Sequence, residues 1–280
     1  MIKTPHSKPY ADRLNAINDQ LCFGAFLADE ATAAMVPVIA AAPLTYTSAA
    51  FPANAHASRI HRELGDLPDF ARQAMSTLCG NALGMGSEHL QTYCAEIRSA
   101  GYAWLGGAPI NPKDGEDEQL RDQLALWGVT GLDEIFETVI YMRRRRNHLV
   151  HARDTIASAM KTFLAARAAP LDAFWAVRPV KLRGFTFTNP DLDTFTIDDG
   201  YAVMNLMRIC LSEIDAAFAA LLPVDPIAVD LANDRVAAAP HLRSNIPVLI
   251  RKVCADLDLQ YGRKYSPRVI APALAAAGYQ

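Results

Sequence analysis

The sequence is poor in the residues from which sheets, disulfide frameworks and zinc ribbons are built. Aromatic residues make up 8% of the 280 residues, and there are 15 glycines. Aromatic and β-branched residues are too sparse for a large sheet, which favours helix. The five cysteines are scattered, odd in number and without any C-x-x-C pair. This usage excludes a disulfide framework and is typical of a reducing compartment.

Long apolar runs are also missing. The longest, residues 31–43, contains Pro37 and is shorter than the roughly 20 residues that a membrane span needs. The N-terminal stretch MIKTPHSKPYADR is polar and lacks the apolar core of a secretory signal. We therefore expect a cytoplasmic protein with no membrane partner. The net charge is −3, so any affinity for nucleic acid must come from a local basic patch.

Helical periodicity dominates what is present, and it predicts helices over about 12–39, 68–101, 133–168 and 198–222. One segment differs. Apolar and polar residues alternate in FTFT and TFTI, and NPDLD between them has the composition of a turn. The predicted fold class is therefore mostly α, with a short β-hairpin insert near residues 183–198.

Composition along the chain suggests three consecutive parts. Residues 1–60 hold a helix and a linker rich in proline, serine and threonine, and residues 61–222 hold the main helical bundle. Residues 223–280 form a helical extension with a basic end that contains Arg263, Lys264 and Arg268.

The densest basic cluster is YMRRRRNHLVHAR, residues 141–153. On a helix at about 100° per residue, Arg144 and His151 are seven apart and share a stripe, and Asn147 lies between them. His148 sits beside His151 on that side. One helix face therefore offers guanidinium, amide and imidazole groups together.

Those groups suit phosphodiester chemistry. Histidine titrates near neutral pH and moves a proton in either direction. Arginine matches a phosphate and stabilises charge that develops on phosphoryl oxygens. Asparagine orients the imidazole or donates to an oxygen. No carboxylate cluster is needed when the nucleophile is the 2′-hydroxyl of RNA.

The stretch from Arg146 to His151, RNHLVH, fits R-N-x-x-x-H and resembles the motif of HEPN domains (higher eukaryotes and prokaryotes nucleotide-binding). The resemblance covers about residues 117–222. It implies a helical bundle, usually dimeric, that works as a metal-independent endoribonuclease in toxin–antitoxin or phage-defence systems. Its catalytic residues would be Arg146, Asn147 and His151, with no cofactor and no metal. RNA would be the substrate, and an antitoxin protein is a possible partner that the resemblance suggests.

Further residues of the cluster are expected to bind substrate: Arg143, Arg144, Arg145 and His148. Two other interpretations stay open. One is a non-catalytic HEPN-like module that binds RNA, a nucleotide or a partner protein, and the other is a helical scaffold whose basic face is only solvated. Zinc at His148 and His151 is disfavoured because no nearby carboxylate or cysteine completes a site.

Overall fold

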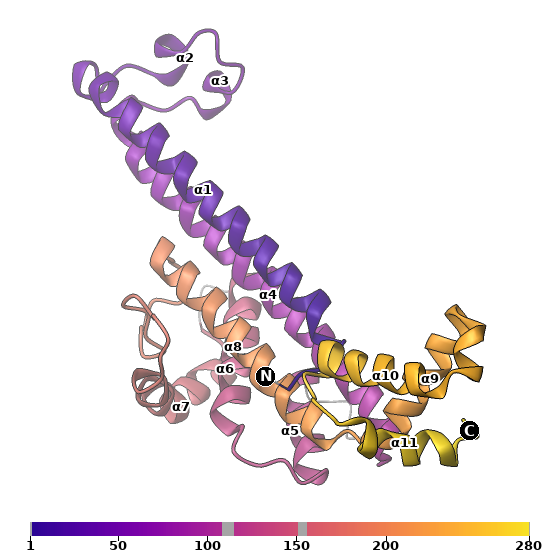
Figure 1. Ribbon diagram of the computed structural model, residues 1–280. Helices are drawn as coiled ribbons and strands as arrows, with labels where there is room; N and C mark the ends of the chain where they lie inside the picture. Colours follow the sequence, from indigo (N-terminus) through magenta and orange to yellow (C-terminus); the bar gives the residue numbers. More distant parts are fainter. Residues whose placement is uncertain (1, 108–114, 151–155, 280) are drawn as a thin grey trace. The chain divides into compact units, whose positions relative to one another are not determined.

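The protein is mostly helical, as the sequence predicts (Figure 1). The structure, a computed structural model, describes residues 2–107, 115–150 and 156–279. These ranges contain no strand, and their β pairing is limited to one bridge between Tyr46 and Glu63. The helices are α1 (Ser7–Ala41), α2 (Thr47–Ala50), α3 (Ala57–Ile60), η1 (Leu64–Asp66), α4 (Leu67–Leu105), α5 (Glu116–Leu126), α6 (Asp133–Val150), α7 (Ser158–Ala176), α8 (Ile197–Leu221), α9 (Val224–Ala238), η2 (Pro240–Ser244), α10 (Ile246–Tyr261) and α11 (Pro267–Ala276).

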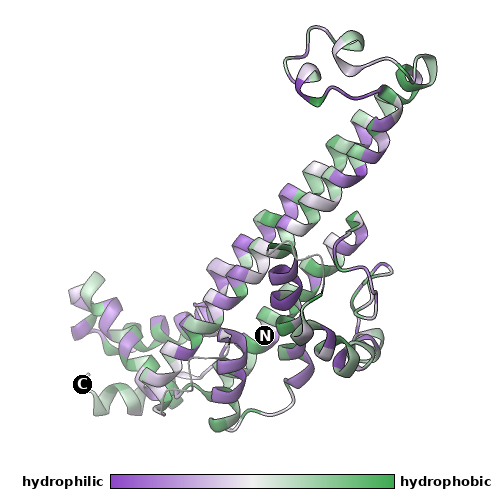
Figure 2. Ribbon diagram, turned by 180° about the vertical axis from the view of Figure 1, so that it is seen from behind, coloured by the Kyte–Doolittle hydropathy of each residue, from purple (hydrophilic) through white to green (hydrophobic). Residues whose placement is uncertain are grey.

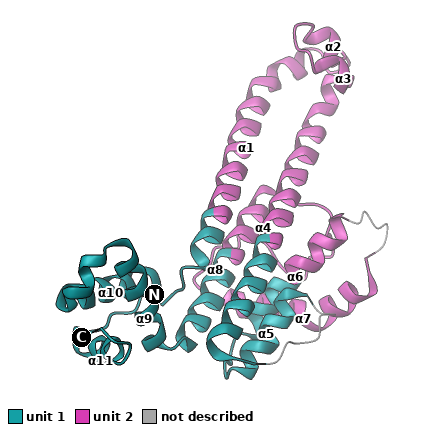
Figure 3. Ribbon diagram, turned by 90° about the vertical axis from the view of Figure 1, so that its right-hand side faces the viewer, with its two compact units in different colours: residues 1–12, 89–140, 208–280 teal, residues 13–88, 141–207 magenta. Residues whose placement is uncertain are grey.

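The chain divides into two compact units that do not follow the three consecutive parts expected from composition (Figure 3). Unit 1 comprises residues 1–12, 89–140 and 208–280, and unit 2 comprises residues 13–88 and 141–207. The reason is the length of the helices, because α1, α4, α6 and α8 each contribute residues to both units. Composition along the chain does not reveal that segments far apart in the sequence belong to the same unit.

Unit 2 is built around α1 and α4, which run antiparallel and are joined through α2, α3 and η1 (Figure 1). Glycines let the helices approach. A Cβ on Gly24 of α1 would overlap Leu78 of α4, and a Cβ on Gly86 of α4 would overlap Met207 of α8. Because glycine is unfavourable within a helix, its use at these two places indicates that close packing decides the residue type.

The second half of α1, from about residue 23, has many apolar residues that are exposed (Figure 2). Phe23, Phe26, Leu27 and Val36 are exposed. By length and composition, α1 is the one helix in the described ranges that is able to cross a membrane. A single such helix near the N-terminus is weak support for a membrane span, since core helices and signal sequences meet the same test.

Residues 183–196 form a loop, so the expected β-hairpin is not present in the structure. The alternation that suggested strands has another cause. Phe185, Phe187, Leu192 and Phe195 are buried one at a time, and the rings of Phe185 and Phe187 both pack edge-on against Tyr141. The period of two at Phe185 and Phe187 therefore comes from loop side chains that pack into the core, and not from a strand.

Side chains, and not a second strand, satisfy the backbone of this loop. Asp172 of α7 accepts from the N–H groups of Phe187 and Thr188 at 2.7 and 3.2 Å. Ser76 of α4 accepts from the N–H of Phe195 at 2.9 Å. Buried backbone donors need partners, and here side chains of two helices outside the loop supply them.

In unit 1, α9, α10 and α11 pack against one another. Asp215 of α8 is buried and accepts from the N–H of Thr4 at 2.7 Å and from the hydroxyl of Tyr93 at 3.0 Å. Arg263 from the basic C-terminal end is also buried, and it donates to the carbonyls of Leu222, at 2.8 Å, and Ala219. The C-terminal segment thus caps the last turn of α8, where carbonyls lack helical partners.

Candidate functional site

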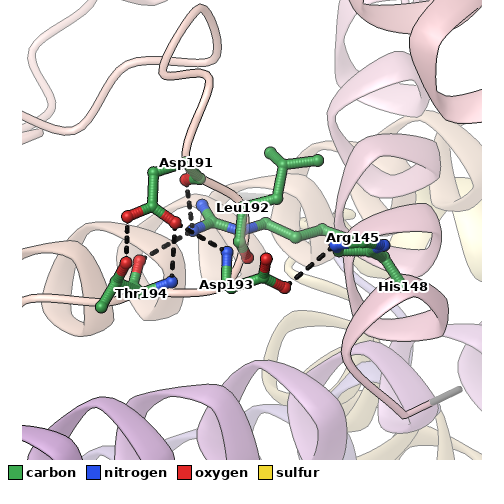
Figure 4. Close-up of polar contacts among 6 residues, drawn as sticks. All are labelled: Arg145, His148, Asp191, Leu192, Asp193 and Thr194. Atoms are coloured by element: carbon green, nitrogen blue, oxygen red, sulfur yellow. Dashed lines mark hydrogen bonds and ion pairs between the residues drawn. The ribbon is translucent and has the colours of Figure 1, made fainter. Parts of the chain in front are cut away.

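The four consecutive arginines of α6 have different surroundings, because a helix turns each to a different side. Arg145 is only 1% exposed. Its guanidinium donates to the carbonyls of Leu192 and Thr194, at 3.1 and 3.2 Å (Figure 4). It also donates to the hydroxyl of Tyr141 at 3.2 Å. It also lies 3.9 Å from the centre of the Phe195 ring.

Arg145 therefore holds the loop to α6, and in this structure its donors are not available to a phosphate. Substrate binding by Arg145, which the sequence suggested, is replaced by a structural role. The neighbouring Arg144 is half-buried, donates to the carbonyl of Ala159 at 3.0 Å and lies 5.1 Å from the centre of the Phe163 ring. Arg143 is half-buried as well.

Arg146 faces a pocket of about 750 Å³ within unit 2. Its Nη1 donates to Oδ1 of Asn147 at 3.0 Å, and its Nη2 lies 3.3 Å from Oε2 of Glu88. The side chain is 33% exposed. Arg146 is thus oriented by two side-chain oxygens and still accessible to a ligand, unlike Arg145.

The walls of the pocket come from three segments. The described lining residues are Ser76, Thr77, Gly80, Asn81, Gly84, Met85 and Glu88 from α4, Arg146, Leu149 and Val150 from α6, and Asp193 and Phe195 from the loop. On α4, Ser76, Gly80, Gly84 and Glu88 are four residues apart and share one face. The pocket is open along this face because Gly80 and Gly84 have no side chain beyond a hydrogen atom.

His148 is only 6% exposed, and it lines no wall of this pocket. Its Nε2 lies 2.9 Å from Oδ1 of Asp193 (Figure 4). This is an ion-pair distance for a protonated ring, yet neither ring nitrogen has a hydrogen-bond partner with acceptable geometry among the described residues. Because it is buried, His148 does not present its ring nitrogens to a ligand in the pocket, contrary to the expectation.

His151, the expected catalytic histidine, lies outside the described residues. The structure therefore brings together two of the three expected catalytic side chains, Arg146 and Asn147. The described residues contain no group of three or more His, Cys, Asp or Glu side chains arranged to hold a metal ion.

The sequence did not indicate that Asp193 and Phe195 belong to this site. They follow Arg146 by more than forty residues and lie in a segment that resembled strands. The loop owes its shape partly to Asp191, which accepts from the N–H groups of Asp193 and Thr194, both at 3.0 Å. Hydrogen bonds from the Thr194 hydroxyl and N–H hold the pKa of Asp191 below its usual value of 3.8. The four-residue spacing of Ser76, Gly80 and Gly84 was the one available signal for a recess on α4.

Comparison of the chain with family models, with curated proteins and with solved structures found no match.

Proposed function

We propose that this chain is a metal-independent endoribonuclease of the HEPN type. One observation carries the proposal. Of the four consecutive arginines, Arg146 is the one that fits R-N-x-x-x-H and also the one that lines the pocket, with Asn147 accepting from its guanidinium. On a basic face that is only solvated, nothing would favour Arg146 over the other three arginines as the one that lines a pocket.

The proposed reaction is a transesterification within RNA. The 2′-hydroxyl attacks the adjacent phosphorus and gives up its proton, and the bond from phosphorus to the 5′-oxygen breaks. The products are a 2′,3′-cyclic phosphate and a 5′-hydroxyl, which takes up a proton. His151 transfers protons, Arg146 stabilises the charge on the phosphoryl oxygens, and Asn147 keeps the guanidinium in place.

A labelled RNA incubated with the protein in excess EDTA tests this proposal. We expect cleavage to persist, with cyclic phosphate ends. Arg146→Ala and His151→Ala should each lower the rate by about 10² or more. The control is Arg243→Ala, which removes an exposed arginine from η2 of unit 1 and should cut like the unmodified chain. The mechanism would be contradicted if Arg146→Ala cleaved at the unmodified rate, or if EDTA stopped cleavage by the unmodified chain.

The second candidate is a non-catalytic HEPN-like module that binds RNA, a nucleotide or a partner protein. The ion pair between Arg146 and Glu88 favours it, because a carboxylate already neutralises part of the charge that a phosphate would meet. This module would bind RNA without producing cut ends.

The cellular setting is proposed on the resemblance alone. It comprises a cytoplasmic homodimer of toxin–antitoxin or phage-defence type, with RNA as substrate and an antitoxin protein as a possible partner. In a symmetric dimer both copies of each motif residue are present, since an isologous interface duplicates every side chain.

A further inference from the structure

The pocket beside Arg146 carries two carboxylates that the proposed cleavage does not use. Glu88 and Asp193 both line it, and their side chains are 62% and 75% exposed. Arg146 is the one cation among its described lining residues. Ionised carboxylates only accept hydrogen bonds. The pocket therefore selects a ligand with donors on one edge.

The remaining lining suits a flat ring. Met85 and Val150 are exposed apolar side chains on its walls, and Leu149 and Phe195 lie deeper. A Cβ on Gly80 would lie 3.8 Å from Cδ1 of Leu149 and 3.9 Å from Cε2 of Phe195. Leu149 and Phe195 therefore pack close to the backbone of Gly80 and form an apolar part of the wall there. The volume of about 750 Å³ lies within the roughly 300–1,000 Å³ of small-molecule sites.

A nucleobase has these properties, and proteins read unpaired RNA bases by apolar contact with their faces and hydrogen bonds to their edges. The four bases differ on the Watson–Crick edge. Guanine presents two neighbouring donors, N1–H and N2–H, which match the two oxygens of one carboxylate. Adenine and cytosine each place an acceptor nitrogen beside one amino group, and uracil has one N–H between two carbonyls. A carboxylate therefore favours guanine over the other three.

The geometry points to Glu88 as the carboxylate that reads this edge. Oδ1 of Asp193 lies 2.9 Å from Nε2 of His148, so this carboxylate lies beside a ring that is not part of the pocket lining. Oε2 of Glu88 instead lies 3.3 Å from Nη2 of Arg146. A guanidinium beside a carboxylate complements guanine, whose O6 acceptor adjoins N1–H. Arginine has five N–H donors, so contact with O6 leaves others for a phosphate.

We propose that this pocket binds a guanine base, with Glu88 accepting from N1–H and N2–H and Arg146 donating to O6. The assignment of RNA as the source of that base rests on the proposed function. If both hold, the enzyme cuts RNA beside guanosine.

Equilibrium binding of GMP, AMP, CMP and UMP to the full chain tests the pocket without any cleavage. We expect GMP to bind at least about fivefold more tightly than the other three, because one bidentate contact to a base discriminates by about 1–3 kcal/mol, or roughly 5- to 150-fold. Glu88→Gln should remove this preference, weakening GMP about tenfold while the other nucleotides change little. Glu88 is exposed, so the variant should fold. The control is Glu30→Gln, an exposed carboxylate on α1 outside the pocket, which should bind like the unmodified chain.

Gly84→Leu tests the location, because a side chain there extends into the pocket and should weaken all four nucleotides alike. Equal affinity for the four nucleotides would overturn the proposal. Undiminished GMP binding by Gly84→Leu, or an equal loss of all four in Glu88→Gln, would overturn it too. Absence of RNA cleavage with the GMP preference intact would instead reject only the ribonuclease and leave a guanine-binding module.

Discussion

Arg145 holds the second half of the loop, residues 189–196, against α6. Its donors meet the carbonyls of Leu192 and Thr194, and its guanidinium covers the ring of Phe195. Phe195 in turn lines the pocket beside Arg146. The two adjacent arginines thus have different roles. Arg145 holds Phe195 in the wall of the pocket, and Arg146 faces the interior of the pocket.

Arg145→Ala should lower the free energy of unfolding by about 2–4 kcal/mol, since it leaves buried carbonyls without donors and removes the contact of the guanidinium with the Phe195 ring. Arg145→Lys should recover only part of this loss, because one ammonium does not reproduce the planar fork. Urea denaturation measures both values. Arg243→Ala, which removes an exposed arginine, is the control and should change stability by less than about 0.5 kcal/mol. A similarly small effect of Arg145→Ala would contradict the structural role.

At the scale of elements, the loop depends on Asp191, whose carboxylate accepts from Thr194 and Asp193. These bonds lower its pKa in the folded state below 3.8. The stabilisation is therefore present above pH 3.8 and is lost as the pH falls through the lower folded pKa. Asp191→Asn should be less stable than the unmodified chain at neutral pH, and the difference should shrink below about pH 4. Thermal unfolding across this range measures it, and a difference independent of pH would contradict the role of the charge.

Helices and loop differ in how far the sequence could predict them. The long helices follow from local spacing of apolar residues, which repeats over many turns and needs no knowledge of distant partners. In the loop, Phe185 and Phe187, and further on Phe195, alternate with threonines as they would in strands. Whether such a segment pairs with a strand or folds onto side chains depends on Asp172, Ser76 and Arg145, which local sequence does not bring together.

The candidate site shows the same limit. The helical motif located Arg146 and Asn147, whose contact the structure contains. It did not separate Arg145 from Arg146, although one is buried and the other lines a pocket. That distinction arises because the loop covers one side of α6 and leaves the next side open, so it required the positions of residues more than forty apart in the chain.

At the scale of the whole molecule, α1 has an exposed face that carries apolar residues. Phe23, Leu27, Ala34 and Ala41 are exposed and are separated by four or seven residues, which places them along one side of the helix. Exposed apolar surface of this kind on a helix marks an interaction site. Because two such faces lose their contact with water when they pack together, we expect a second copy of this chain to cover the face.

Sedimentation equilibrium should therefore give twice the chain mass of 30.5 kDa. Phe23→Asp combined with Leu27→Asp should shift the protein to the monomer, since two carboxylates would lose hydration in the interface. Both positions are exposed, so the helical circular dichroism should stay unchanged. Val177→Asp, an exposed apolar position after α7, is the control and should remain dimeric. A monomer in the unmodified chain would reject the dimer, and flotation of that monomer with lipid vesicles would show that a membrane covers α1 instead.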